Sequence, residues 1–256
     1  MALTVYSLWH REIVRFLRDR SRVFSSVGQP ILFWLLFAGA LRRSEMPGGL
    51  SYGEYFFAGT LAMIVMFTAI FSTITVIEDR KEGFLQGVLV SPVPRAAIAL
   101  GKISGTATLA VLHALLFLAL APLAGVPLGL DAFVAGLGVL VLMALALAGV
   151  GFSLAWVMDS SAGFHGVMMV FLMPMLLLSG AFFPAEGTHP VLGVLMAVNP
   201  LTYAVSLLRH ALYAGTAATA ELPSVALCLA VTLAFAFGTF ALGTRIVLRR
   251  TARDAI

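Results

Sequence analysis

The sequence predicts an all-α membrane protein that crosses a lipid bilayer with six transmembrane helices. Hydrophobic residues make up 61% of its 256 residues and charged residues only 11%, whereas soluble domains carry about 25% charged residues. The mean hydropathy is +1.02. So little charge cannot cover a water-exposed surface. The apolar residues also fall in long blocks, and a spanning helix needs roughly 20 of them in a row.

Six apolar blocks are long enough to cross the hydrocarbon core. Sequence patterns place their ends to within about 2–4 residues. The predicted spans are Val23–Leu41, Tyr55–Ile77, Ile103–Gly125, Ala132–Val157, Gly163–Phe183 and Ser224–Leu248.

The region 184–223, between the last two blocks, is apolar only in patches. Val191–Val198 reaches about 12 Å at 1.5 Å per residue, well short of the hydrocarbon thickness. Asn199 and Pro200 then break the helix, because proline lacks an N–H and disfavours helix in the residue before it. Leu201–Tyr213 can form a second short helix. We therefore expect short re-entrant helices before the last span, on the external side, rather than a seventh span.

Basic residues orient the chain in the membrane. Thirteen of the 16 lysines and arginines lie on one side of the predicted spans, and the positive-inside rule makes that side, with both termini, cytoplasmic. The three on the other side are Arg42, Arg43 and Arg209. These flanking residues also account for the net charge of +4, so no nucleic acid is expected as a partner.

Residues 1–22 are predicted to form an N-terminal amphipathic interfacial helix. Arginines at spacings of four, three and four residues share one face, and they are Arg11, Arg15, Arg18 and Arg22. The opposing apolar stripe consists of Tyr6, Trp9, Ile13 and Phe16. A helix of this kind lies flat among lipid headgroups. A solvated helix with the same pattern is the alternative.

The predicted spans contain no Asp, Glu or Lys. A proton-coupled transporter normally uses carboxylates inside the membrane, and a membrane-embedded enzyme needs a nucleophile with a base, or paired acids. His113 lies mid-span without an evident partner, so it either packs between helices or lines a polar path. The five histidines lack ligand spacing, and no metal site is expected.

A phosphate-binding loop, G-x-x-x-x-G-K-[ST], is also missing. Around the Gly101-Lys102 pair, Ala96 replaces the first glycine and Ile103 replaces the Ser/Thr. The chain is therefore expected not to be an enzyme and to bind no cofactor. If it moves a solute uphill, a separate ATP-hydrolysing subunit must supply the energy and dock on the cytoplasmic loop 78–102.

Loop 78–102 has the composition of a docking element. Charges of both signs open it, and Pro92 and Pro94 stiffen its exit. Between them lies an apolar patch of Phe84, Leu85, Val88 and Leu89. A short helix carrying this patch fits a partner's groove, while the charges set register and steer encounter. A plain connector with a solvated charge run is the alternative.

Two separated motifs resemble the type-2 ABC export permeases, the family of daunorubicin-resistance and nodulation-factor-export transmembrane subunits. The first is Glu78-Asp79-Arg80-Lys81-Glu82-Gly83 with Leu85, then Ser91-Pro92-Val93-Pro94-Arg95 and Gly101-Lys102. The second is Leu178-Ser179-Gly180-Ala181-Phe182-Phe183-Pro184 with Pro190, then Asn199-Pro200-Leu201-Thr202-Tyr203-Ala204 and Leu208-Arg209. The chain departs from the family at Phe84, where a threonine is usual, and at Gln86, where an acid is usual.

The resemblance implies one transmembrane permease domain over residues 1–256, with a cytoplasmic coupling helix in loop 78–102. The residues implied to contact the ATP-binding subunit are Glu78, Arg80, Glu82, Gly83, Phe84, Leu85, Pro92 and Arg95. The residues implied to form the external gate and re-entrant signature are Gly180, Pro184, Asn199, Pro200, Tyr203 and Arg209.

The same resemblance implies the partners and the role. Two ATP-binding subunits, which hold ATP and Mg, would dock below this chain and a second permease, either a copy or a paralogue, in a bacterial cytoplasmic (inner) membrane. The expected cargo is hydrophobic or amphiphilic: a drug-like molecule, a lipid or a lipid-linked glycan. The alternatives are an ATP-independent channel or secondary transporter, and a membrane-embedded enzyme.

Overall fold

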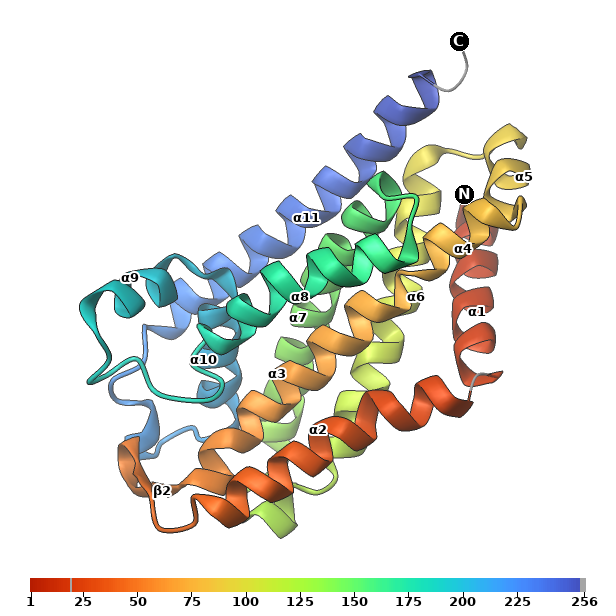
Figure 1. The fold of residues 1–256 in the computed structure, drawn as a ribbon. Coiled ribbons are helices and arrows are strands. Elements are labelled where there is room, and N and C mark those ends of the chain that lie inside the picture. The colour runs from red at the N-terminus through yellow and green to blue at the C-terminus, as the bar shows by residue number, and fades with distance from the viewer. Residues whose placement is uncertain (19, 254–256) are drawn as a thin grey trace.

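A computed structural model describes the backbone of residues 1–18 and 20–253 and the side chains of residues 1–18 and 28–249. The chain is a bundle of α-helices with one short β-hairpin (Figure 1). The elements are α1 (Ala2–Arg18), α2 (Arg20–Ala40), β1 (Glu45–Met46), β2 (Leu50–Ser51), α3 (Tyr52–Ser72), α4 (Thr75–Lys81), α5 (Phe84–Val90), α6 (Arg95–Leu118), α7 (Leu130–Val157), α8 (Ser161–Leu177), α9 (Pro190–Val198), α10 (Pro200–Leu212) and α11 (Val225–Arg253), with 3-10 turns at Pro47–Gly49, Ala121–Ala124 and Ala217–Thr219.

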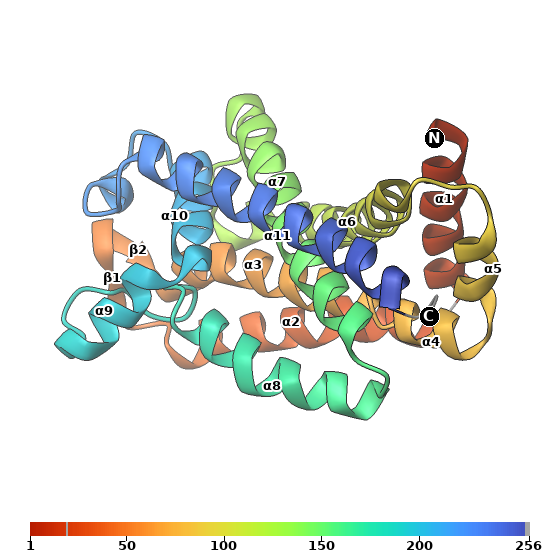
Figure 2. The same cartoon turned by 90° about the horizontal axis from the view of Figure 1, so that it is seen from above.

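Helix α3 forms the centre of the bundle. It packs against α2, α6 and α7, and α11 crosses α7 on the far side (Figure 2). Because α3 is apolar on every face, it is stable only when other helices surround it. A capping box fixes its first turn: the Ser51 hydroxyl accepts from the Glu54 N–H, and the Glu54 carboxylate accepts from the Ser51 N–H.

In the part of the chain that the structure describes, four helical segments are long and apolar enough to cross a membrane: Tyr52–Lys81, Arg95–Leu118, Leu130–Val157 and Val225–Arg249. The bent pair α9–α10 makes a fifth if it is counted as one span. The predicted first and fifth spans correspond to α2 and α8. The described apolar part of α2 is Gly28–Ala40, and both it and α8 are shorter than 18 residues. A mostly helical membrane protein is confirmed, and the count of six spans stays a prediction.

The helix break predicted at Asn199-Pro200 lies between α9 and α10, whose axes bend by 82°. The Asn199 side chain caps α10 by accepting from the Leu201 N–H at 3.0 Å, and it donates to the Met175 carbonyl at 2.6 Å. Pro200 occupies the first turn of α10, where its missing N–H has no partner to lose.

One predicted boundary is wrong. The third long helix begins at Arg95, well before the predicted Ile103, so Lys102 lies inside α6. A proline before the first residue starts this helix without lost hydrogen bonds.

Of the amphipathic helix predicted over residues 1–22, the structure describes Ala2–Arg18 as α1. Arg22 falls in α2, and its side chain lies outside the described residues.

Candidate functional site

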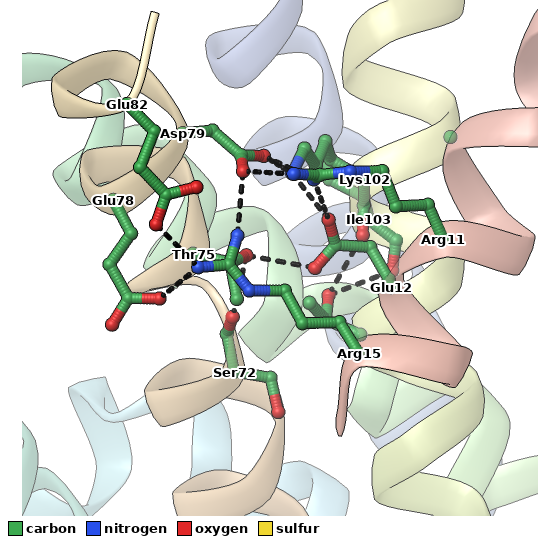
Figure 3. Close-up of polar contacts among 12 residues, drawn as sticks. Arg11, Glu12, Arg15, Ser72, Thr75, Glu78, Asp79, Glu82, Lys102 and Ile103 are labelled. Carbon is green, nitrogen blue, oxygen red and sulfur yellow. Dashed lines mark hydrogen bonds and ion pairs between the residues drawn. The ribbon is translucent and has the colours of Figure 1, made fainter. Parts of the chain in front are cut away.

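Three ionisable side chains from three helices meet at the end of the bundle that holds α5. Glu12 of α1, Asp79 of α4 and Lys102 of α6 are only 2%, 0% and 1% exposed. The Lys102 ammonium donates to both carboxylates (Figure 3). The second Glu12 oxygen accepts from the Thr75 hydroxyl at 2.8 Å. This buried triad therefore ties α1, α4 and α6 together.

Two arginines of α1 extend the triad toward solvent. Arg11 donates to both oxygens of Asp79, at 2.8 and 2.7 Å. Arg15 donates to Asp79 at 2.7 Å, to Glu78 at 2.9 Å and to Glu82 at 3.2 Å. Burial lowers the pKa of Arg11, but the hydrogen bond and charge of Asp79 outweigh it and raise the pKa. The triad and its flanking charges Arg11, Arg15, Glu78 and Glu82 are called the ionic cluster below.

The ionic cluster gives two arginines of α1 partners that the sequence does not predict. Arg11 and Arg15 face the carboxylates of α4, and the position of α1 among lipid headgroups stays a prediction. Ion pairs with good geometry are strongest where water is excluded. Arg18 remains exposed. Trp9 also points inward, where its indole N–H donates to the Thr108 hydroxyl at 3.0 Å.

Two glycines of α6 explain how α1 comes close enough to form the triad. A Cβ at Gly101 would lie 2.8 Å from Cβ of Leu8, and a Cβ at Gly105 would lie 2.8 Å from Cβ of Glu12. Residues four apart share one helix face, so the two glycines form a smooth strip on α6. Small residues at such a spacing allow close helix contact.

The loop between the second and third long helices forms a helical hairpin of α4 and α5. Gly83 has φ +81° at the turn, a conformation that glycine adopts without strain. Leu85 is 2% exposed, and Phe84 lies under the Arg11 guanidinium, 3.7 Å from the ring centre. Leu85 and the inner side of the patch therefore pack against the chain itself, and contact of Phe84 and Leu85 with a partner stays a prediction.

The surface that α5 leaves open is a different one. Gln86, Gly87 and Val90 are exposed, with Val90 at 86%. Glu82, Gly83 and Pro92 are exposed beside them. We call these residues of the hairpin, Glu82, Gly83, Gln86, Gly87, Val90 and Pro92, the α5 face. Its backbone is held from inside by the packing of Leu85, so the face is presented on a fixed support.

Two further predicted contact residues stabilise the hairpin from within. Arg80 donates to Asp159 at 2.7 Å and to the Trp156 carbonyl at 2.6 Å, which ties α4 to the end of α7. Arg95 donates to the Leu89 carbonyl at 2.9 Å, at the last turn of α5. Both arginines thus position α5 rather than extend toward solvent.

His113 is buried, 4% exposed, between α1, α3 and α6. Its Nδ1 lies 3.3 Å from the Thr68 hydroxyl oxygen, and its ring centre lies 5.2 Å from that of Phe16. These contacts favour the packing alternative for His113 over a position along a polar path.

The predicted gate residues gather at the opposite end of the bundle. Gly180 has φ +76°, and its carbonyl accepts from the Tyr55 hydroxyl and from Arg209, both at 2.7 Å. The Tyr203 hydroxyl donates to the Ala197 carbonyl at 2.8 Å. Pro184 lines a cavity beside them. The two predicted motifs thus lie at opposite ends of the molecule (Figure 1).

None of the three triad residues is among the predicted contact residues, although Asp79 and Lys102 stand in the first motif. Glu12 interrupts the basic face of the N-terminal helix, and Lys102 precedes the predicted start of the third span, where it resembles an ordinary flanking charge. A signal is present nonetheless, since a lysine between Gly101 and Gly105 is unusual next to an apolar block.

Comparison with known proteins agrees with the two motifs. The profile of the ABC-2 type transporter family matches residues 4–213. Nodulation protein J of Neorhizobium galegae is 28% identical over 200 residues, which cover 73% of this chain and 72% of that protein. Nodulation protein J of Rhizobium leguminosarum bv. viciae is 25% identical over 257 residues, with 94% of each chain covered. The putative transport permease ycf38 of Cyanophora paradoxa is 24% identical over 213 residues, with 80% and 72% covered.

Proposed function

The chain belongs to the ABC-2 type transporter family, and on that premise we propose that it is the transmembrane subunit of an ATP-driven exporter. The observation that carries the proposal is the ionic cluster, which joins the hairpin α4–α5 to α1 and α6 at one end of the bundle (Figure 3). A force applied to the α5 face would be passed to three helices at once.

The energy must come from a partner. The sequence has no phosphate-binding loop, so ATP and Mg would be held by two ATP-binding subunits. Their contact would be the α5 face, where Val90 is 86% exposed. An exposed apolar side chain supported by rigid packing is typical of an interface anchor.

Force would travel from α5 into the membrane along two routes. Helix α4 follows α3 almost without interruption, and Tyr52–Lys81 counts as one span. Lys102 lies in α6 and pairs with Asp79 of α4. Movement of the hairpin would therefore shift α3 and α6, the two helices that pack against each other in the core. Packed interiors transmit displacement because they have low compressibility.

The remaining parts of the proposal concern topology and assembly. Six spans, with α2 and α8 as the first and fifth, place both termini in the cytoplasm, and α9–α10 form the external re-entrant pair. The membrane would be the bacterial inner membrane. A second permease, a copy or a paralogue, would complete the path, and the apolar interior suits a hydrophobic or amphiphilic cargo.

Photo-crosslinking in cells tests the docking surface without assuming which protein binds there. A photoreactive amino acid at Val90 should capture a protein that carries a G-x-x-x-x-G-K-[ST] loop, identified by mass spectrometry. The matched control is Leu123, which is 82% exposed in the turn after α6. Buried Leu85 is the second control. Neither control should capture that protein.

Capture of the same protein from Leu123, or capture of proteins without the loop from Val90, would contradict the proposal. The rival function, an ATP-independent channel or secondary transporter, makes a different prediction. In that case the purified chain alone, in proteoliposomes, would move a solute, and ATP-binding proteins would have no effect on the rate.

A further inference from the structure

A cavity of about 530 Å³ lies at the end of the bundle opposite the ionic cluster. Its walls come from the β1–β2 hairpin, the segment 179–186, α9, α10 and the segment 217–223. The walls mix apolar side chains, including Leu50 and Met196, with hydroxyl groups, including Ser206 and Thr202. Such a mixture suits a molecule with an apolar body and a polar group.

One buried arginine lines this cavity. Arg209 is 5% exposed, and a guanidinium remains charged at all physiological pH values. Its Nη2 donates to the Gly180 carbonyl at 2.7 Å, and the guanidinium lies 3.8 Å from the centre of the Tyr55 ring. Its Nε is buried without a hydrogen-bond partner. Among the described side chains, no carboxylate forms an ion pair with Arg209.

A buried charge with so few partners is energetically unfavourable, because burial removes water and only an opposite charge or several hydrogen bonds replace it. A carbonyl and a ring face satisfy part of the guanidinium. Planar or tetrahedral oxyanions are the further partners that arginine binds best.

We propose that this cavity binds an oxyanion, a phosphate or a carboxylate, borne on an amphiphilic molecule, and that Arg209 contacts it. The identification of that molecule as cargo rests on the proposed function. The sequence alone suggests a cargo without strong charge, because no counter-charge is evident in the predicted path. The buried Arg209 supplies one such counter-charge.

Two glutamates at the cavity mouth modulate the site. Glu186 and Glu221 line it and are exposed. A hydrogen bond with Glu221, then burial and the like charge of Glu221, raise the pKa of Glu186, against the opposing charge of Arg209. The other titratable side chains of the wall are Tyr55 and Tyr203. Protonation of the pair removes negative charge, so oxyanion binding should strengthen as the pH falls.

The test uses the purified full-length chain in phosphatidylcholine nanodiscs and isothermal titration calorimetry. The probes are hexyl phosphate, hexyltrimethylammonium, hexanol and inorganic phosphate. Hexyl phosphate should bind, and the cation and the alcohol should bind at least about tenfold more weakly, since charge-assisted hydrogen bonds contribute roughly that factor. Arg209→Gln should weaken hexyl phosphate binding about tenfold or more. Arg43→Gln, an exposed arginine near the hairpin, is the matched control and should have no effect.

Replacing the buried Arg209 also perturbs folding, so a second variant that leaves Arg209 unchanged is included in the test. Ala185 is exposed and lines the cavity, so Ala185→Trp should fill the cavity and weaken binding while Arg209 stays intact. Glu221→Gln should strengthen binding at pH 8 and reduce its dependence on pH.

Three arms separate the sources of the oxyanion. Equal affinity for inorganic phosphate and hexyl phosphate would show that the oxyanion alone is sufficient for binding. Tighter binding of hexyl phosphate identifies an amphiphile. Competition by phosphatidylglycerol in the nanodisc identifies a lipid headgroup. Each supports the oxyanion site. Equal binding of the cation or the alcohol, or unchanged binding in both Arg209→Gln and Ala185→Trp, would overturn it. The assay contains no ATP-binding subunit, so its failure is distinguishable from failure of the proposed function.

Discussion

Replacing Lys102 by methionine tests the energetics of the buried triad most sharply. The substitution keeps an unbranched side chain, one heavy atom shorter than lysine, and removes its charge. Asp79 would keep Arg11 and Arg15 as partners, both at 2.7 Å. Glu12 would keep the Thr75 hydroxyl, and its nearest remaining cation would be Arg11 at 3.9 Å. The cost therefore falls on Glu12, which is 2% exposed.

Removing one partner of a buried ion pair typically costs about 3–5 kcal/mol, because it leaves an uncompensated charge. We expect Lys102→Met to lower the free energy of unfolding by about that amount. Adding Glu12→Gln removes the stranded charge, and the amide oxygen still accepts from Thr75. The double variant should regain at least about 2 kcal/mol relative to the sum of the single changes.

The assay is reversible unfolding of the purified chain in mixed micelles, followed by tryptophan fluorescence, on all four members of the cycle. Lys81→Met is the control, since Lys81 is exposed at the end of α4, and it should change stability by less than about 0.5 kcal/mol. Additivity of Lys102→Met and Glu12→Gln to within about 0.5 kcal/mol would refute the reasoning.

Three further predictions follow from other contacts. Gly105→Leu should displace α1 and lower the thermal unfolding midpoint, because even a Cβ at this position would lie 2.8 Å from Cβ of Glu12. The control is Gly138→Leu, which should change the midpoint little, because a Cβ there meets nothing within 4 Å. Leu85→Ala should lower the free energy of unfolding by about 2–5 kcal/mol in the same assay. Val90→Asp should leave the free energy of unfolding unchanged and abolish co-purification of the ATP-binding subunit. The reverse pattern would contradict the assignment of inner and outer faces of α5. The raised pKa of Glu186 means that the folded chain holds this proton more tightly than the unfolded chain. Its contribution to stability should therefore be present at acidic pH and lost as the pH rises through the folded pKa, and Glu221→Gln should flatten this part of the stability–pH profile.

The long apolar helices are predictable because hydrophobic blocks of bilayer length leave few alternatives. The break at Asn199-Pro200 is predictable for a local reason, since proline restricts both itself and the residue before it. Both features depend only on residues close together in the sequence.

The inner contacts of the candidate site cannot be predicted in this way. Glu12 and Lys102 are 90 residues apart, and nothing local states that they meet. The patch on α5 is apolar by composition, but whether Phe84 faces a partner or the chain itself depends on Arg11 of α1, which lies far from it in sequence. The burial of Arg209 likewise depends on Tyr55 and Gly180, which come from other segments.

The central claim is that α1 and the hairpin α4–α5 move as one unit when the ATP-binding subunits close. Electron–electron double resonance on the assembled complex measures this directly, with labelled chains diluted among unlabelled ones. Leu3 of α1, Val90 of α5 and Leu130 at the far end of α7 are 78%, 86% and 78% exposed and can carry spin labels. Trapping ATP should change the Val90–Leu130 and Leu3–Leu130 distances together and leave the Leu3–Val90 distance constant. A change in the Leu3–Val90 distance, with Leu3 fixed relative to Leu130, would contradict the claim.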